Sequence, residues 1–559
     1  MKKIGFKNFR KFEDFPSISF GNVTYLVGQN NAGKSTMVKA AILVLENLLQ
    51  KDQVSFAAQA YFDFVSSLHN LHIDTFARAC HRGSNNPRMQ FSATIGEFEF
   101  EITVIPADNE ILHSFIQTEQ DTYAPIEYLS MKDTRLGVKI SIRPFVAQYE
   151  IEFEGVESES SRQAREILNK ISNRIEKLKK DIALENERIN NTLVGMIPPS
   201  LLKQNSELDD LMRKQKTLLK SLDNNVHERL IFNAIDLNHS KATENSYSIV
   251  REIEEFAKVA KYDDANKQAR LSSYDFNISE KERRQQGQYL TKLRRHSEVL
   301  SKMAVRLSAL LNSIDFMYIP AHLASQEVVL NSHTKDIFAS VVDKYAHRTQ
   351  KYDRDKSIYR YLQKWMDADH FNIGKGFIIE EKLPGYYTLT IETFDKGMIP
   401  VGDMGMGTNQ LMILLLHIAN KMKYGVSEQM LEKRTQNDNN RVGPIIFIEE
   451  PEQNLHPNLQ SKLAEFFYEL ATSNVNRMQF IVETHSEYII RKSQYIVASQ
   501  RYKDEKDMEY NPQKVYFFSS TKPAYDMHYH TNGVFEEPFE PGFYDMASDI
   551  SMETLALSM

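Results

Sequence analysis

The 559-residue sequence predicts an α/β fold with an antiparallel β-subdomain and an inserted helical hairpin. Three observations predict it: a glycine-rich turn between a strand pattern and a helix pattern, two stretches of alternating apolar residues, and a heptad pattern. From their positions we expect residues 1–155 and 315–559 to form one split core. Residues 156–314 are expected to form the helical insertion between its two parts.

The glycine-rich turn is residues 28–36, which read Gly-Gln-Asn-Asn-Ala-Gly-Lys-Ser-Thr. A strand pattern at 23–27 precedes it and a helix pattern at 37–49 follows. In that context the turn is a phosphate-binding loop, since backbone N–H groups and a helix N-terminus face the phosphates. Lys34 adds a positive charge there, and Ser35 offers a hydroxyl ligand to Mg²⁺. We therefore expect the chain to bind ATP or a related triphosphate through Asn30, Asn31, Ala32, Gly33, Lys34, Ser35 and Thr36.

Alternation between residues 89 and 104 predicts the β-subdomain. Residues 89–95 and 97–104 both alternate with period 2, as half-buried strands do. In the second stretch Phe98, Phe100 and Ile102 would share one face. These stretches predict an antiparallel meander inserted after the first helix.

The heptad pattern begins near residue 160 and breaks at residues 195–200, Gly-Met-Ile-Pro-Pro-Ser. Two seams around a Pro-Pro turn predict an antiparallel coiled-coil hairpin. The alternative is two amphipathic helices on a domain surface, and the regular first seam favours the hairpin. We expect residues 223–313 to be helical and polar. The seams comprise Ala164, Leu168, Ile171, Ile175, Leu178, Ile182 and Ile189, then Leu208, Leu211, Leu218 and Leu222.

Residues 444–450 predict a buried strand that ends in two carboxylates. In most proteins, acidic residues after an apolar strand only mark the point at which the chain leaves the core. Here a phosphate-binding loop is present, and P-loop folds place one such carboxylate near Mg²⁺ and the next near the attacking water. We therefore assign Glu449 to the metal and Glu450 to the water.

A further strand pattern at 479–483 ends in Thr484, His485 and Ser486. A lone histidine is usually a satisfied surface or core group. The position of His485 after a core strand, downstream of the acidic strand, favours a role as a sensor of the γ-phosphate.

Residues 401–410 are glycine-rich and lead into an apolar helix pattern at 411–419. Gly405 and Gly407 would let backbone N–H groups approach an anion, beside Thr408 and Asn409. The alternative is a glycine-rich turn in which Thr408 or Asn409 caps the helix.

Composition limits the remaining function classes. The chain is 42% apolar and 26% charged, which is ordinary for a soluble globular protein. It has no apolar run near the roughly 20 residues of a membrane span, so no membrane role is expected. Cys80 is the only cysteine, which excludes intrachain disulfides. The first residues lack a signal-peptide pattern, and we expect a cytoplasmic protein.

In order and spacing, residues 28–36, 402–410, 444–450 and 484–486 resemble the ABC-type ATPases of the SMC, RecF and OLD grouping. The resemblance implies an ABC-type P-loop ATPase core and an ATP-gated dimer. In such a dimer the triphosphate lies between the P-loop of one protomer and the signature segment, here residues 405–410, of the other. Residues 6–12 also resemble the first strand and turn of this group, which would put Arg10 close to the nucleotide.

Residues 449–457 and 483–486 further resemble prokaryotic AAA family ATPases of antiphage systems, most closely the PtuA branch of Septu and retron systems. This implies a homodimer or higher oligomer that gates an HNH nuclease of the PtuB type. In a retron system a reverse transcriptase with its msDNA would join it, and nucleic acid would be reached through the complex. The 74 residues beyond His485 are too few for the Toprim nuclease domain of OLD proteins.

Two departures from the transporter pattern suggest slow hydrolysis: Glu449 stands where aspartate is usual, and residues 405–410 replace Leu-Ser-Gly-Gly-Gln. The missing transporter signature also disfavours a transporter ATPase. A RecF- or SMC-like DNA-binding ATPase in repair remains the alternative, with phosphate contacts from a basic stretch whose interspersed glutamates also fit a solvated helix face. That stretch contains Arg283, Arg284, Lys292, Arg294 and Arg295.

Overall fold

The structure is a computed structural model with two compact units. One comprises Met1–Gln53, Ala57–Glu127 and Ala309–Met559, and the other comprises Val54–Phe56 and Tyr128–Ser308. The three-part division expected from the sequence remains a prediction. The structure describes residues 1–50, 61–65, 73–83, 87–106, 122–144, 148–154, 159–190, 199–221, 227–233, 296–321, 327–334, 336–352, 356–395, 397–422, 443–473, 476–500, 508–519, 524–540, 543–544 and 552.

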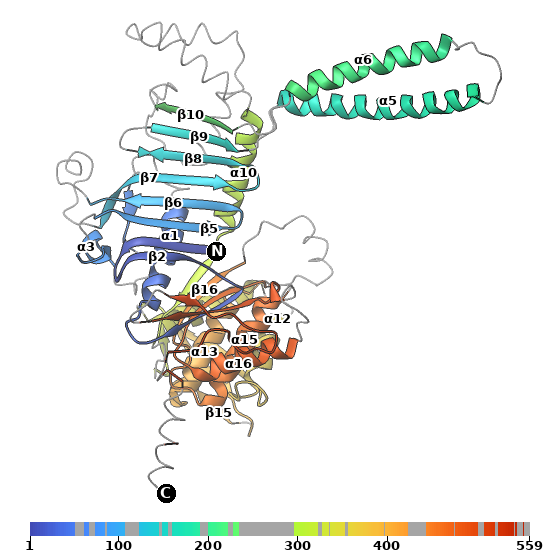
Figure 1. The fold of residues 1–559 in the computed structure, drawn as a ribbon. Helices are drawn as coiled ribbons and strands as arrows, with labels where there is room; N and C mark the ends of the chain where they lie inside the picture. The colour runs from blue at the N-terminus through green and yellow to red at the C-terminus, as the bar shows by residue number, and fades with distance from the viewer. Residues whose placement is uncertain are drawn as a thin grey trace. The chain divides into compact units, whose positions relative to one another are not determined.

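A six-stranded sheet forms the centre of the first unit (Figure 1). Its strand order is β11-β16-β17-β3-β18-β19, and all neighbours are parallel except the β18–β19 pair. Every residue of β3 is buried, as expected for a central strand of a parallel sheet. The strands are β3 (Val23–Gly28), β11 (Phe316–Ile319), β16 (Ile445–Glu449), β17 (Gln479–Glu483), β18 (Gln513–Phe518) and β19 (Tyr525–Asp526).

Helices complete the core around this sheet. Contacts join α1 to β3 and β17, and α15 to the same two strands, with α16 packed on α15. The helix α13 is buried along most of its length. The strand patterns at 23–27 and 479–483 and the first helix pattern are therefore confirmed, and the pattern at 444–450 corresponds to β16, which ends at Glu449. The helices are α1 (Lys34–Gln50), α13 (Met406–Ala419), α15 (Pro457–Thr472) and α16 (Glu487–Gln500).

A smaller antiparallel sheet and two further helices also belong to the first unit. The sheet order is β12-β14-β13, with β15 paired to β14. Trp365 of α12 is only 1% exposed and its ring packs against Phe371 and Phe466. The elements are β12 (Leu330–Asn331), α11 (Ile337–Tyr352), α12 (Ser357–Met366), β13 (Gly376–Leu383), β14 (Tyr386–Glu392), β15 (Met398–Pro400) and η4 (Val401–Asp403).

The predicted antiparallel meander follows α1. In the first unit β2, β1, β5 and β6 are neighbours in that order, and β4 pairs with the start of β7. On β6 the side chains of Phe98, Phe100, Ile102 and Val104 are buried while those between them are more exposed, so this prediction is confirmed. The elements are β1 (Lys3–Phe9), β2 (Phe12–Ser19), β4 (Tyr61–Asp63), α3 (Phe76–Ala79), β5 (Met89–Ile95), β6 (Phe98–Val104) and β7 (Tyr123–Asp133).

The described part of the second unit contains the end of β7, three more antiparallel strands and three helices. Asp133 is fully buried and pairs with Arg306 of α10 at 2.6 Å, while His296 stacks on Phe153. The sequence predicts helix throughout 223–313, and this is wrong for β10, whose backbone pairs with the edge of β9. Strand pairing at a sheet edge overrides weak local preference. The elements are β8 (Val138–Arg143), β9 (Gln148–Glu154), α5 (Glu159–Asn190), α6 (Pro199–Ser221), β10 (His227–Asn233) and α10 (Ser297–Ser313).

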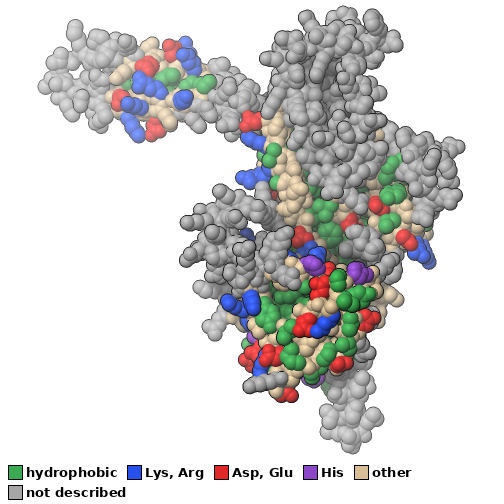
Figure 2. Space-filling view, turned by 180° about the vertical axis from the view of Figure 1, so that it is seen from behind, with side chains coloured by type: hydrophobic (Ala, Val, Ile, Leu, Met, Phe, Trp, Pro, Cys, Tyr) green, Lys and Arg blue, Asp and Glu red, His purple; other side chains and the backbone are tan. Residues whose placement is uncertain are grey.

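The helical hairpin consists of α5 and α6. Gln215 donates to Ser172 at 3.0 Å, and Arg174 pairs with Glu207 at 2.9 Å, which makes the two helices antiparallel. The seam residues Ile175 and Leu178 are buried. Figure 2 shows basic and acidic side chains interspersed on the described part of this hairpin. The fold class is therefore confirmed, whereas coiled-coil supercoiling remains a prediction.

Two sequence features lie wholly or mostly outside the described residues. They are the basic residues at 283–295 and the helix break at 195–200, of which only Pro199 and Ser200 are described, as the start of α6. Among the described helices, none is both long enough and apolar enough to cross a membrane.

Candidate functional site

The loop between β3 and α1 has the geometry of a phosphate-binding loop. Lys34 is buried and its Nζ donates to the carbonyl oxygens of Gly28 at 3.0 Å and Gln29 at 2.9 Å. Gly33 has a φ of +111°, and a Cβ there would lie 2.3 Å from the ring of Phe12. Glycine is required at Gly33 both for its conformation and for this close approach. The lysine is thus held against the loop that it would share with a phosphate group.

A cavity of about 560 Å³ lies over this loop. Its lining includes every predicted P-loop contact except Asn30, which is exposed. Among the described residues that line it, Glu483 is the one carboxylate. A strongly cationic lining attracts a polyanion such as a triphosphate. The lysines and arginines of the lining are Arg10, Lys11, Lys34, Lys39, Arg78 and Arg82.

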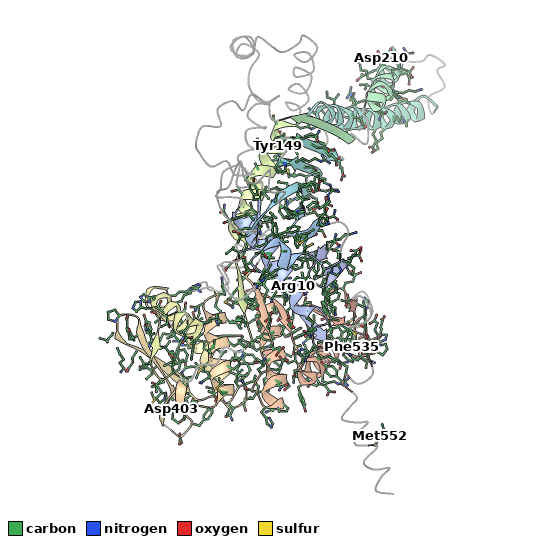
Figure 3. The ribbon with its side chains drawn as sticks, turned by 90° about the vertical axis from the view of Figure 1, so that its left-hand side faces the viewer. Arg10, Tyr149, Asp210, Asp403, Phe535 and Met552 are labelled. Atoms are coloured by element: carbon green, nitrogen blue, oxygen red, sulfur yellow. The ribbon has the colours of Figure 1, made fainter. Side chains whose placement is uncertain are left out.

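Arg10 reaches the cavity from the turn between β1 and β2, where Figure 3 labels it. Its backbone N–H donates to Ala79 at 2.7 Å, and its carbonyl oxygen lies 2.8 Å from Nδ1 of His81. Burial lowers the pKa of the Arg10 guanidinium. The neighbouring Lys11 donates to the carbonyl of Asn31 at 2.8 Å. The β1–β2 turn is therefore tied both to the P-loop and to residues 79–81 that form another part of the cavity lining.

Glu483, the last residue of β17, contacts the P-loop directly. Its Oε1 accepts from Ser35 Oγ at 3.0 Å and lies 3.9 Å from Lys34 Nζ. The side chain is almost fully buried. Burial, reinforced by the nearby Glu449, raises the pKa of Glu483 to about 7, against the opposing effect of Lys34. This carboxylate therefore links the end of β17 to the loop that follows β3.

The two carboxylates at the end of β16 have different surroundings. Burial, reinforced by the nearby Glu449, raises the pKa of Tyr318 on β11 well above its ordinary value. Glu450 has a φ of +44°, an uncommon conformation for a residue other than glycine. Its N–H donates to the carbonyl of Glu483 at 2.8 Å, and its carboxylate accepts from Gln453. The chain turns sharply here and separates the two side chains.

His485 lies beside Glu450. Its Nε2 is 3.8 Å from Glu450 Oε1, and its backbone N–H donates to Oε1 of Glu452 at 2.6 Å. Burial, and to a lesser extent Lys34, lowers the pKa of His485, while Glu450 opposes this shift. A neutral imidazole can accept or donate one hydrogen bond, as contact with a phosphate oxygen requires.

These residues fit a magnesium–nucleotide. Mg²⁺ prefers oxygen ligands, and Ser35, Glu449, Glu450 and Glu483 supply oxygens around the start of α1. The Oε2 atom of Glu483 is buried and has no hydrogen-bond partner among the described residues. Ligand atoms of Glu450, Glu483 and His485 lie within 4.8 Å of one another.

The glycine-rich segment before α13 is built differently from the P-loop. The helix begins at Met406, with Gly405 as its N-cap and no side-chain cap, so the alternative of a cap by Thr408 or Asn409 is wrong. A Cβ on Gly407 would lie 2.6 Å from the carbonyl oxygen of Asn454, whereas one on Gly405 would meet no atom within 4 Å. Asp403, labelled in Figure 3, marks η4 just before this helix.

The structure brings together only part of the predicted site. Residues 31–36 and Arg10 share the cavity, and Glu450 and His485 approach it beside Glu483. None of the described cavity-lining residues comes from α13, so Gly405, Gly407, Thr408 and Asn409 lie elsewhere on this chain's surface or core. Their roles, like those of the other predicted site residues, remain predictions.

Sequence reasoning missed several residues of this site. Glu483 could have been found, because it ends a core strand in the same way as the carboxylates of β16. Lys39 follows Ser35 by one helical turn, which is a second usable signal. Arg78 and Arg82 gave no local signal, since they reach the cavity only through tertiary packing.

Comparison with known proteins agrees with this geometry. A model of the AAA ATPase domain family matches residues 1–490. The sequence finds no match among curated proteins.

Several solved SMC head domains are similar over nearly the whole chain, with TM-scores too low to support a further argument. The Smc head domain of Pyrococcus furiosus, bound to the C-terminal domain of ScpA, is 13% identical, with a TM-score of 0.30 and coverage of 99% of this chain and 98% of that chain. That of Pyrococcus yayanosii is 12% identical, with a TM-score of 0.32 and coverage of 98% and 99%. That of Thermotoga maritima is 10% identical, with a TM-score of 0.30 and coverage of 94% and 98%.

The family match covers the strand, loop and helix that form the phosphate-binding corner and both carboxylate-ending strands. It ends at residue 490, within α16. Sequence family and site chemistry therefore agree, and the chain belongs to the AAA ATPase domain family and is an ATPase.

Proposed function

We propose that this ATPase is an ATP-gated dimer that regulates a partner nuclease. The observation that supports the dimer is that the N-terminus of α13, which has no side-chain cap, does not contribute to the described lining of this chain's cationic cavity. A helix N-terminus attracts anions through its free N–H groups and dipole. In the dimer, Gly405, Gly407, Thr408 and Asn409 of one copy face the γ-phosphate held by the P-loop of the other.

Within each half-site, this chain's residues bind and orient the reactants. Lys34 and the backbone of residues 30–36 hold the phosphates, with Arg10 beside them. Ser35 and Glu449 hold the Mg²⁺, which supplies neutralising charge to the β- and γ-phosphates when bound. Glu450 accepts the proton of the attacking water, and His485 contacts the γ-phosphate.

The partner in this proposal is an HNH nuclease of the PtuB type in an antiphage system, with a retron reverse transcriptase and its msDNA as further members in retron systems. Support comes from the acidic and histidine motifs, which resemble those of antiphage ATPases. A chain that hydrolyses ATP and gates another enzyme needs no nuclease centre of its own. The complex acts in the cytoplasm.

Light scattering tests the dimer. The Glu450→Gln protein, which hydrolyses ATP slowly, should be monomeric without nucleotide and at least dimeric with ATP and Mg²⁺. Thr408→Glu should prevent this shift by repelling the partner's triphosphate, while a single chain still binds a fluorescent ATP analogue. A dimer that forms equally well with Thr408→Glu contradicts the proposed position of this segment.

Co-expression tests the partner. The chain should co-purify with an HNH nuclease of the PtuB type, and Lys34→Ala should change the cleavage of DNA by that complex. Tight, strongly salt-dependent binding of duplex DNA by the chain alone, with no capture of the nuclease, would instead support the DNA-repair alternative.

A further inference from the structure

Three carboxylates end two neighbouring strands at the nucleotide site, and their distances from the P-loop differ. Glu449 and Glu483 are paired in register on β16 and β17. The strand β17 lies directly beside β3, where Glu483 pairs with Leu26, whereas β16 is one strand further away. The sheet order therefore places Glu483 nearer to the loop that holds the phosphates.

Side-chain contacts agree with this order. Ser35 Oγ donates its proton to Glu483 Oε1 at 3.0 Å, so the oxygen lone pairs of Ser35 remain available for a cation. Glu483 is 5% exposed, and its Oε2 lacks a hydrogen-bond partner among the described residues. A buried carboxylate oxygen without a partner costs free energy, which a bound cation would recover.

Glu449 lies one strand further from the P-loop than Glu483, and Tyr318 is on β11, the next strand beyond β16. Of the two groups of possible metal ligands among the described residues, the one at this site contains Glu450, Glu483 and His485, and Glu449 is not part of it.

We infer that Glu483 is a ligand of the Mg²⁺ that accompanies the nucleotide. It orients Ser35 through Oε1 and offers Oε2 to the cation. In the absence of nucleotide, the same carboxylate lies near Lys34. The inference rests on the proposed magnesium–nucleotide site and adds to it a cation ligand that the acidic motif of β16 does not contain.

Metal binding can be measured without hydrolysis. Titration of Mn²⁺ into the protein with a non-hydrolysable ATP analogue, followed by electron paramagnetic resonance, gives the affinity of the cation. Glu483→Gln should weaken it by about 10–100-fold, the range typical for loss of groups that hold a metal or its ligands. Without any divalent cation, the affinity for a fluorescent ATP analogue should stay within about threefold of wild type or rise, because Lys34 loses an anionic neighbour.

The Glu483→Gln variant distinguishes a metal ligand from a residue that only holds Ser35 in position. The amide oxygen of the glutamine still accepts the hydrogen bond from Ser35. If Glu483 only positioned Ser35, the variant would therefore keep the wild-type Mn²⁺ affinity. An affinity within about twofold of wild type in Glu483→Gln would overturn the inference. Glu469→Gln, which removes an exposed carboxylate paired with Lys364, is the matched control.

Glu483→Asp keeps the charge and provides a second test if the glutamine variant folds poorly, as judged by thermal unfolding. It should retain more Mn²⁺ affinity than Ser35→Ala, and equal losses in both would contradict direct ligation by the carboxylate. These titrations concern binding to one chain. A protein that binds magnesium–nucleotide but never dimerises would refute the proposed gating and leave this assignment intact.

Discussion

Two glycine-rich segments lead into helices in the first unit, and they end in opposite surroundings. The start of α1 lies under a cavity whose lining carries six cationic side chains of the same chain. The start of α13 has no side-chain cap, and Gly405 faces open space. In the proposed dimer, similar backbone chemistry would form a nearly complete half-site at α1 and an unmatched one at α13. The difference teaches that an anion site needs surrounding charge as well as free N–H groups.

The largest effect is expected at Glu450, the residue proposed to accept the proton of the attacking water. Glu450→Gln should retain nucleotide binding and lower the rate of ATP hydrolysis by at least about 100-fold, because a general base is lost. Phosphate release under saturating ATP measures this rate. Hydrolysis at the wild-type rate would show that another group activates the water.

Lys34→Ala should have the next largest effect, since it removes the buried cation of the α1 half-site. Loss of a charge-assisted hydrogen bond of about 1.5–3 kcal/mol predicts roughly 10–150-fold weaker ATP binding. A fluorescent ATP analogue measures the affinity. Lys364→Ala, at an exposed lysine paired with Glu469, is the control. An affinity within threefold of wild type would mean that the cavity's other cations suffice.

Gly405 and Gly407 sharpen the comparison at α13. Gly407→Ala places a Cβ against the Asn454 carbonyl oxygen and should lower the free energy of unfolding by about 1–3 kcal/mol. Gly405→Ala adds its methyl group to open space and should lower the free energy of unfolding less, by about 1 kcal/mol or below, because alanine is a poorer N-cap than glycine. Chemical denaturation of both variants measures the difference. Equal stabilities would show that the turn at Asn454 moves to accommodate the added methyl group without a loss of unfolding free energy.

The smallest effect concerns His417, near the end of α13. Burial, and then Lys344 and Lys421, lower its pKa to about 3. His417 therefore takes up a proton near pH 6.5 in the unfolded chain but stays neutral in the folded chain. The free energy of unfolding consequently falls as the pH drops below about 6.5. Between pH 7.5 and 5.5 this group should cost about 1 kcal/mol of unfolding free energy. His417→Gln should flatten that part of the curve, and an unchanged pH dependence would contradict the assignment.

Local patterns predicted much of the fold and part of the site. The P-loop, the alternating strands β5 and β6, and the strands that end at Glu449 and Glu483 are each encoded within short stretches. The strand β10 was missed because its seven residues were assigned together with the polar stretch around them, whereas its backbone pairs with β9. The positions of Arg78 and Arg82 depend on packing between distant segments, which no single stretch of sequence records.

Trp365 gives this molecule an intrinsic optical probe. It is the single tryptophan of the sequence, and its ring packs against Phe466 of α15 in the P-loop unit. Its emission therefore reports the packing of that unit alone, while the helical hairpin contributes no tryptophan signal. Label-free fluorescence can thus separate the unfolding of the ATPase core from that of the hairpin in the intact chain.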